Sequence, residues 1–125
     1  MAGSLIADRV FDNGLTILDT EVNEVTLCSQ APTDYTGAHT TYKLGTKASP
    51  TVSAPTDGTT GRKVTLSAIT DGALSAAGTA THIALSDTSN TRLLAVLPLA
   101  SSVAVASSGT WTCTAADITF ADPTQ

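Results

Sequence analysis

The feature that most constrains the fold is a short alternation of apolar and polar residues that recurs along most of the chain. The segment RKVTLSAIT, residues 62–70, places Val64, Leu66 and Ala68 alternately with Lys, Thr and Ser. This period of two is typical of a strand with one buried face. Roughly seven or eight such segments recur at intervals of about 8–12 residues, separated by turn-forming residues. The sequence therefore predicts a mainly β protein, either an antiparallel β-sandwich or a small barrel.

One α-helix is expected at the N-terminus. The residues from Ser4 to about Asp19 carry apolar side chains at helical spacing, and Ser4 is a suitable N-cap. The sequence DNG at residues 12–14 is a weak point that would kink this helix or divide it into two pieces. We expect residues 1–22 to form a helical segment that packs on a β-sandwich domain of residues 23–125.

The first strand is expected in EVTLCSQ, which begins at Glu24. Its alternation places Val25 and Leu27 on one face and Thr26 and Cys28 on the other. The stretch QAPTDYTGAHTT that follows is expected to be a long loop, because Pro and Gly interrupt it. A short strand, TYKLG, is expected after this loop.

Turns are expected to connect the central strands. Asp71 and Gly72 form a DG pair that is typical of a hairpin turn, and Gly78 would mark a bulge in the next strand. The stretch THIALSDTSNTRLLAVLPL, residues 81–99, predicts a hairpin with its turn at DTSN. The apolar face of this hairpin is expected to pack in the core and consists of Ile83, Leu85, Leu94 and Val96. One or two closing strands are expected within SSVAVASSGTWTCTAADITF.

Residues 47–60 form an extended stretch that is rich in Pro and Thr and has few large apolar side chains. Two interpretations are open. The stretch is a flexible linker, or it is an ordered surface arm in which Val52 docks as a short edge strand.

The composition limits the classes of partner. Charged residues make up 14% of the chain, against about 25% in an ordinary soluble domain, and Thr is the most frequent residue. Such a neutral surface suits either an interface or a stable Thr-rich β-protein. The net charge of -5 argues against nucleic-acid binding, which needs a basic face. No apolar run approaches the roughly 20 residues of a membrane span, and no secretory signal is recognisable, so we expect synthesis in a cytoplasm and no membrane partner.

The sequence offers little for catalysis. A triad of His82, Asp87 and Ser86 is disfavoured, because neighbouring strand residues face opposite sides and no nucleophile-elbow motif surrounds the serine. His82 is expected to be structural, and His39 has no partner at metal-ligand spacing. The stretch DGTTGRK lacks the glycine spacing and the following helix of a phosphate loop. We therefore expect no catalytic, metal or cofactor site, and no enzyme.

Two interpretations also remain open for the two cysteines, Cys28 and Cys113, which lie far apart in the sequence. Both would be buried, reduced thiols that act as small apolar groups. Alternatively, a disulfide would join an early strand to a late one, which requires an oxidising setting.

Several segments together resemble a family of small virion-associated proteins of tailed bacteriophages and prophages. They are FDNGLTILDTEVNEVTLCSQAPT, TYKLGTK, GRKVTLSAITDG, GTATHIALSD, RLLAV and DITFADP, and they extend over nearly the whole chain. The resemblance implies a virion structural protein that is made in the host cytoplasm. Its size and style are similar to those of capsid decoration, or cement, proteins, which bind the outer shell at subunit junctions and stabilise it non-covalently.

The resemblance also implies partners. The major capsid protein is expected, together with self-association as a trimer or dimer. The N-terminal segment or the arm of residues 47–60 would lie across capsid subunits. The expected contacts of the arm are Lys47, Pro50, Val52, Pro55, Thr59 and Thr60. The alternatives are a tail, neck or fibre-associated virion component, and a free binding module or small enzyme.

Overall fold

A computed structural model describes residues 8–58 and 61–120, with the backbone alone described for residues 8–12. These residues form an N-terminal α-helix, a short π-helix and nine strands, and all strand pairs are antiparallel. The helices are α1 (Asp8–Glu21) and η1 (Gly37–Thr41). The strands are β1 (Glu24–Cys28), β2 (Lys43–Ala48), β3 (Thr56–Asp57), β4 (Arg62–Leu66), β5 (Ile69–Leu74), β6 (Gly78–Asp87), β7 (Arg92–Val105), β8 (Thr110–Cys113) and β9 (Ala116–Phe120). The expected mainly β fold with one N-terminal helix is confirmed.

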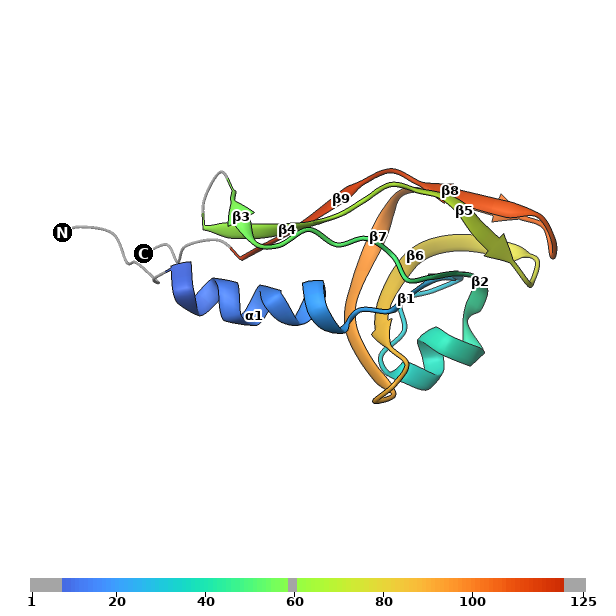
Figure 1. Ribbon diagram of the computed structural model, residues 1–125. Coiled ribbons are helices and arrows are strands. Elements are labelled where there is room, and N and C mark those ends of the chain that lie inside the picture. Colours follow the sequence, from blue (N-terminus) through green and yellow to red (C-terminus); the bar gives the residue numbers. More distant parts are fainter. Residues whose placement is uncertain (1–7, 59–60, 121–125) are drawn as a thin grey trace.

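The strands divide into a large curled sheet and a small sheet. The six-stranded sheet has the order β7-β6-β1-β2-β5-β8 and curls into a half-barrel, and the three-stranded sheet has the order β3-β4-β9. Figure 1 shows α1 lying along the small sheet, with both projecting to one side of the half-barrel. The strands β4–β5 and β8–β9 pass from one sheet into the other and so connect them. For this reason the segment 62–70 is two strands, divided at Ser67 and Ala68, and not the single strand that its alternation predicts.

The helix α1 is part of the main core. Leu15 and Leu18 are buried in one apolar cluster with Val64 and Leu66 of β4. The helix continues without interruption through residues 12–14, so the expected division there is wrong, and Ser4 lies outside the described residues. A Cβ on Gly14 would lie 2.9 Å from Cε2 of Phe120, so a larger residue here would require the partly exposed Phe120 ring to shift.

The strand β1 and the second half of β6, from Ile83 onward, are buried on both faces. Val25 and Leu27 contribute to the main core inside the half-barrel, whereas Cys28 packs with Ala38 and Ala84 in a second cluster on the opposite face. The short helix η1 covers that second face, where a long irregular loop was expected. Its start is fixed by Asp34, whose Oδ1 accepts a hydrogen bond of 2.7 Å from the Gly37 backbone N–H.

The expected hairpin of residues 81–99 is present as β6 and β7, with its turn at residues 88–91. Its two faces differ from the expectation in one residue. Ile83 and Leu85 lie in the main core, but Val96 pairs with Ala84 and packs in the second cluster. The register shift between Leu85 and Ser86 explains this. Leu94 is an extra residue in β7 at this point, so Leu94 and Val96 lie on opposite faces although they are two residues apart.

The turn expected at Asp71–Gly72 is wrong, because both residues lie within β5. Gly72 is needed because Trp111 of the paired strand β8 lies over it, and a Cβ on Gly72 would be 2.3 Å from Cε2 of the indole. The bulge expected at Gly78 is also wrong. Gly78 is the first residue of β6, and the nearest register shift lies between Ala80 and His82.

Candidate interaction surfaces

The arm of residues 47–60 is ordered wherever the structure describes it. Val52 forms an isolated antiparallel bridge with Leu66, as the ordered-arm interpretation predicted. On either side of the bridge, Ser53 N donates to Thr65 O and Ser67 N donates to Thr51 O, both at 2.9 Å. The arm therefore runs along β4 as part of the small sheet, and the flexible-linker interpretation is wrong for this part.

The two ends of the arm are held by ion pairs. Lys47 Nζ lies 2.9 Å from Asp71 Oδ1, and Arg62 Nη1 lies 2.6 Å from Asp57 Oδ1. The Arg62 guanidinium also donates to the carbonyl oxygen of Pro55 at 3.3 Å. Exposed pairs of this kind contribute little stability, so the main-chain bonds to β4 are the stronger restraint.

The expected capsid contacts on this arm therefore have different environments. Val52 faces the main core and is half-buried, whereas Pro50 and Pro55 are partly exposed. Lys47 is engaged by Asp71. Thr59 and Thr60 lie outside the described residues. The outward side chains of the described arm include Thr51, Ala54 and Thr56.

Two of the three residues considered for a triad have other hydrogen-bond partners. Nδ1 of His82 lies 2.8 Å from Thr81 Oγ1. Ser86 is fully buried, and its Oγ has no hydrogen-bond partner among the described residues. Asp87 instead organises the turn between β6 and β7: Oδ1 accepts from Ser89 N at 3.0 Å and Oδ2 accepts from Asn90 Nδ2 at 2.7 Å.

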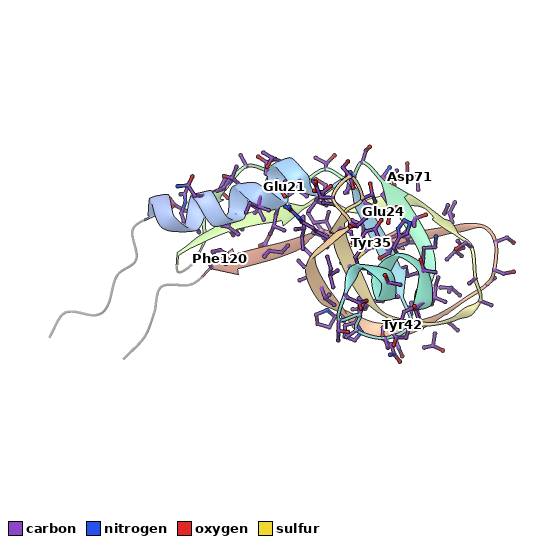
Figure 2. The ribbon with its side chains drawn as sticks, turned by 90° about the horizontal axis from the view of Figure 1, so that it is seen from below. Glu21, Glu24, Tyr35, Tyr42, Asp71 and Phe120 are labelled. Carbon is purple, nitrogen blue, oxygen red and sulfur yellow. The ribbon has the colours of Figure 1, made fainter. Side chains whose placement is uncertain are left out.

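The second histidine joins η1 to β1. His39 Nδ1 lies 2.7 Å from Glu24 Oε1, and the His39 ring stacks on Tyr35 with the ring centroids 5.0 Å apart. Figure 2 shows Glu24 and Tyr35 together beside η1. Partial burial, followed by the negative charges of Glu24 and Asp87, raises the pKa of Tyr35. This cluster fastens η1 over the second face of the large sheet.

Both cysteines are free thiols. Cys28 is buried in the second cluster, and burial raises its pKa, while a hydrogen bond with Thr26 acts in the opposite direction. Cys113 is only partly buried, and burial raises its pKa as well. The structure therefore agrees with the interpretation of two reduced thiols and differs from it in the partial exposure of Cys113.

Stability should fall in acid because of the turn that Asp87 organises. A hydrogen bond from the Asn90 side chain is the largest effect, and it lowers the pKa of Asp87. Burial raises this pKa. The backbone N–H groups of Asn90 and Ser89 and the charge of Arg92 lower it further. The pKa of the folded state is thus below the unfolded value of about 3.9, so the stabilisation is complete above about pH 4 and is lost as the pH falls through the folded pKa. We expect urea midpoints to decrease over this range.

Asp87→Asn should flatten that pH dependence, because the substituted side chain does not titrate. Asp117, whose pKa is lowered by hydrogen bonds from Thr65 and Lys63, contributes with the same sign. The double variant Asp87→Asn/Asp117→Asn should therefore be flatter than either single variant. An Asp87→Asn curve parallel to that of the unaltered protein would contradict the assignment.

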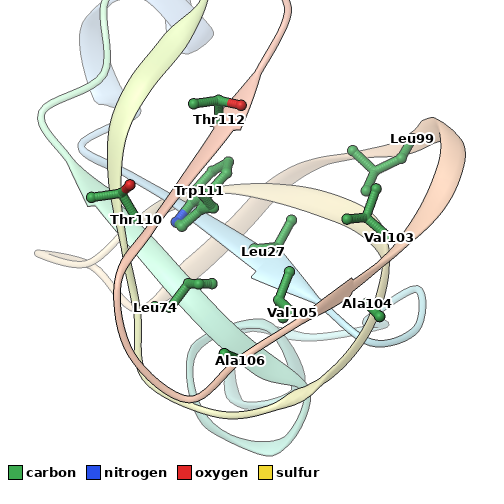
Figure 3. Close-up of a pocket in the computed structure, with 10 residues that line it drawn as sticks. All are labelled: Leu27, Leu74, Leu99, Val103, Ala104, Val105, Ala106, Thr110, Trp111 and Thr112. Carbon is green, nitrogen blue, oxygen red and sulfur yellow. The ribbon is translucent and has the colours of Figure 1, made fainter.

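Uncharged grooves lie on the surface of the described residues, and two of them are relevant here. The barrel groove, of about 380 Å³, lies between β7 and β8 (Figure 3) and is lined by Leu27, Leu74, Leu99, Val103, Ala104, Val105, Ala106, Thr110, Trp111 and Thr112. The helix groove, of about 360 Å³, lies between α1, β7 and β9 and is lined by Gly14, Ile17, Leu18, Leu94, Ala95, Ile118 and Phe120. None of these lining residues is charged.

The exposed large apolar side chains of the described residues lie at these two grooves. Val103, at 52% exposure, lines the barrel groove, and Ile17 and Phe120, at 42% and 40%, line the helix groove. Figure 2 shows Phe120 beside α1. Sequence reasoning placed the expected contacts on the arm and missed both grooves, because each groove is formed by elements that are distant in the sequence.

Comparisons of the chain with protein-family models, with curated proteins and with solved structures find no match. Within residues 8–58 and 61–120, no group of three or more His, Cys, Asp or Glu side chains is arranged to hold a metal ion. Neither helix of this part of the chain has the length and apolar character required to cross a bilayer.

Proposed function

We propose that this protein is a bacteriophage virion structural protein, and that it serves as a capsid decoration, or cement, protein on the outer shell. The observation that carries the proposal is the placement of the exposed large apolar side chains at uncharged grooves. Exposed apolar patches on a small domain are typical of surfaces that bind another macromolecule. The partner is proposed to be a phage capsid because several segments of the chain resemble phage virion proteins.

The helix groove would form the capsid-facing surface, and the arm, which lies at the opposite edge of the small sheet from β9, would extend it. Ile17 and Phe120 offer apolar anchors, each contributing on the order of 1–3 kcal/mol when fully buried. Pro50 and Pro55 add a partly exposed surface with little conformational freedom. Many copies on one lattice would convert a modest affinity at each site into stable attachment. The mechanism is therefore non-covalent, with the major capsid protein as partner.

Imaging of the virion by cryo-electron microscopy tests the location directly. We expect many copies on the outer shell at the junctions of capsid subunits. A few copies at the tail or neck would favour the alternative of a tail, neck or fibre-associated component. Absence of the chain from the virion would overturn both, and ligand-dependent thermal stabilisation would then be the sign of a free binding module or enzyme.

Ile17→Asp tests the capsid-facing surface. Placing a carboxylate in the helix groove should weaken co-sedimentation with capsids by at least about tenfold, because a charge would have to be buried without a partner. Ala77→Asp, a substitution at an exposed position between β5 and β6, adds the same charge and serves as the control. Equal binding by the two variants would exclude the helix groove as the contact.

A further inference from the structure

The large sheet of the described residues has two end strands that lie on either side of the barrel groove. The strands β7 and β8 each pair on one side only, with β6 and β5 respectively. The barrel groove lies between them, with Leu99 and Val103 at one rim and Thr112 at the other (Figure 3). The backbone groups on the outer side of each strand are therefore available for pairing with another chain.

The part of the β7 edge beyond Pro98 lacks the charged side chains that usually protect an edge strand against such pairing. Natural edge strands commonly carry charged side chains, especially Lys. From Leu93 to Ala116 the chain has no Asp, Glu, Lys, Arg or His. Pro98 and the register shift between Ala80 and His82 interrupt the middle of β7. They leave Val103–Val105 as a regular segment, paired on its inner side with residues 78–80.

The charge distribution indicates what covers this edge. The chain carries a net charge of -5, so two copies repel each other except where they meet through a neutral surface. The barrel groove is lined entirely by uncharged residues, and Val103 beside it is the most exposed of the large apolar side chains described. An extended strand from another chain would form hydrogen bonds with the unpaired backbone groups and would cover the apolar lining with its side chains. The same segment of a second copy has these properties.

We propose that β7 self-associates through its outer edge, so that Val103–Val105 of two copies pair antiparallel about a two-fold axis. In such an isologous contact Ala104 lies on the axis and Val103 of each copy lies opposite Val105 of the other, so the two Val103 side chains are diagonal neighbours. The apolar side chains of each copy cover the barrel groove of the other. This interface does not depend on where the protein acts, and its failure would leave the virion proposal intact.

Sedimentation velocity over a wide range of protein concentrations tests the proposal. We expect the unaltered chain to form a dimer. Val103→Asp and Val103→Lys should each sediment as a monomer, because two like charges would be diagonal neighbours across the paired strands. Mixing these two variants in equal amounts should restore the dimer. Circular dichroism should show an unaltered fold for both, since Val103 is largely exposed.

Ile17→Asp provides the matched control, because it places the same charge in the helix groove and should leave the dimer intact. A monomer at every concentration, or an oligomer that Val103→Asp does not affect, would overturn the proposal. A mixture of the Asp and Lys variants that stays monomeric would overturn the two-fold pairing. Loss of capsid binding by Ile17→Asp with the dimer retained would separate the two surfaces.

Discussion

Replacing Gly72 by alanine is expected to lower the free energy of unfolding by about 3 kcal/mol, as is typical of overpacking in a rigid core. A Cβ on Gly72 would lie 2.3 Å from Cε2 and 2.4 Å from Nε1 of Trp111. The indole has little room to move away, because a Cβ at Gly45 would also lie 2.8 Å from it and the Trp111 side chain is only 5% exposed. Urea unfolding followed by fluorescence measures the effect, since Trp111 is the only tryptophan.

A double-mutant cycle separates crowding from other causes. In a Trp111→Leu background the smaller side chain leaves room for a Cβ, so Gly72→Ala should cost far less there than in the unaltered chain. Circular dichroism replaces fluorescence in this background. Gly109→Ala serves as a second comparison, because nothing lies within 4 Å of a Cβ at this position. Its loss of unfolding free energy would be about 1 kcal/mol and would come from the φ of +103° alone. Equal costs for Gly72→Ala in both backgrounds would contradict the packing argument.

Local alternation predicted the class of fold but not how the strands are shared between sheets. The pattern of β4 and β5 is continuous in sequence, yet the chain passes from the small sheet to the large sheet between them. The DG pair at Asp71–Gly72 favours a turn when only its neighbours are considered. The contact with Trp111, which lies about forty residues further along the chain, explains the glycine in a different way.

Local alternation also failed to predict what covers the second face of the large sheet. The alternation of β1 placed Thr26 and Cys28 on the face opposite Val25 and Leu27, and they do lie there. Both are nevertheless fully buried, because η1 covers that face. Nothing in the alternation of β1 indicates this cover. A π-helix held by Asp34 and by the His39–Glu24 contact has no strong signature in sequence.

The candidate surfaces were predictable only in part. The docking of Val52 agrees with one of the two interpretations left open for the arm, in which the one large apolar residue of a Pro- and Thr-rich stretch finds a place to dock. The grooves required knowledge of which elements meet. One signal was available, however, because the lack of charge from Leu93 to Ala116 marks the strand that borders both grooves.

Leu15→Ala is expected to lower the free energy of unfolding by about 3 kcal/mol, the central range for removing a buried leucine side chain. Leu15 is fully buried and packs from α1 into the cluster that contains Val64 and Leu66. Ala has the higher helix propensity, so the loss would come from packing and not from the helix itself. Urea unfolding should remain a single transition when followed by Trp111 fluorescence in the half-barrel and by far-ultraviolet circular dichroism.

Ile17→Ala is the matched control on the same helix, because it removes a similar apolar side chain that is 42% exposed. Its cost should stay below about 1 kcal/mol, since less apolar surface is lost and helix propensity improves slightly. If the two variants had equal stability, Leu15 would not be a core residue. If Leu15→Ala melted α1 while leaving the transition at Trp111 unchanged, the helix would be a separate appendage. A joint loss at both probes would instead make α1 part of the same cooperative unit as the half-barrel.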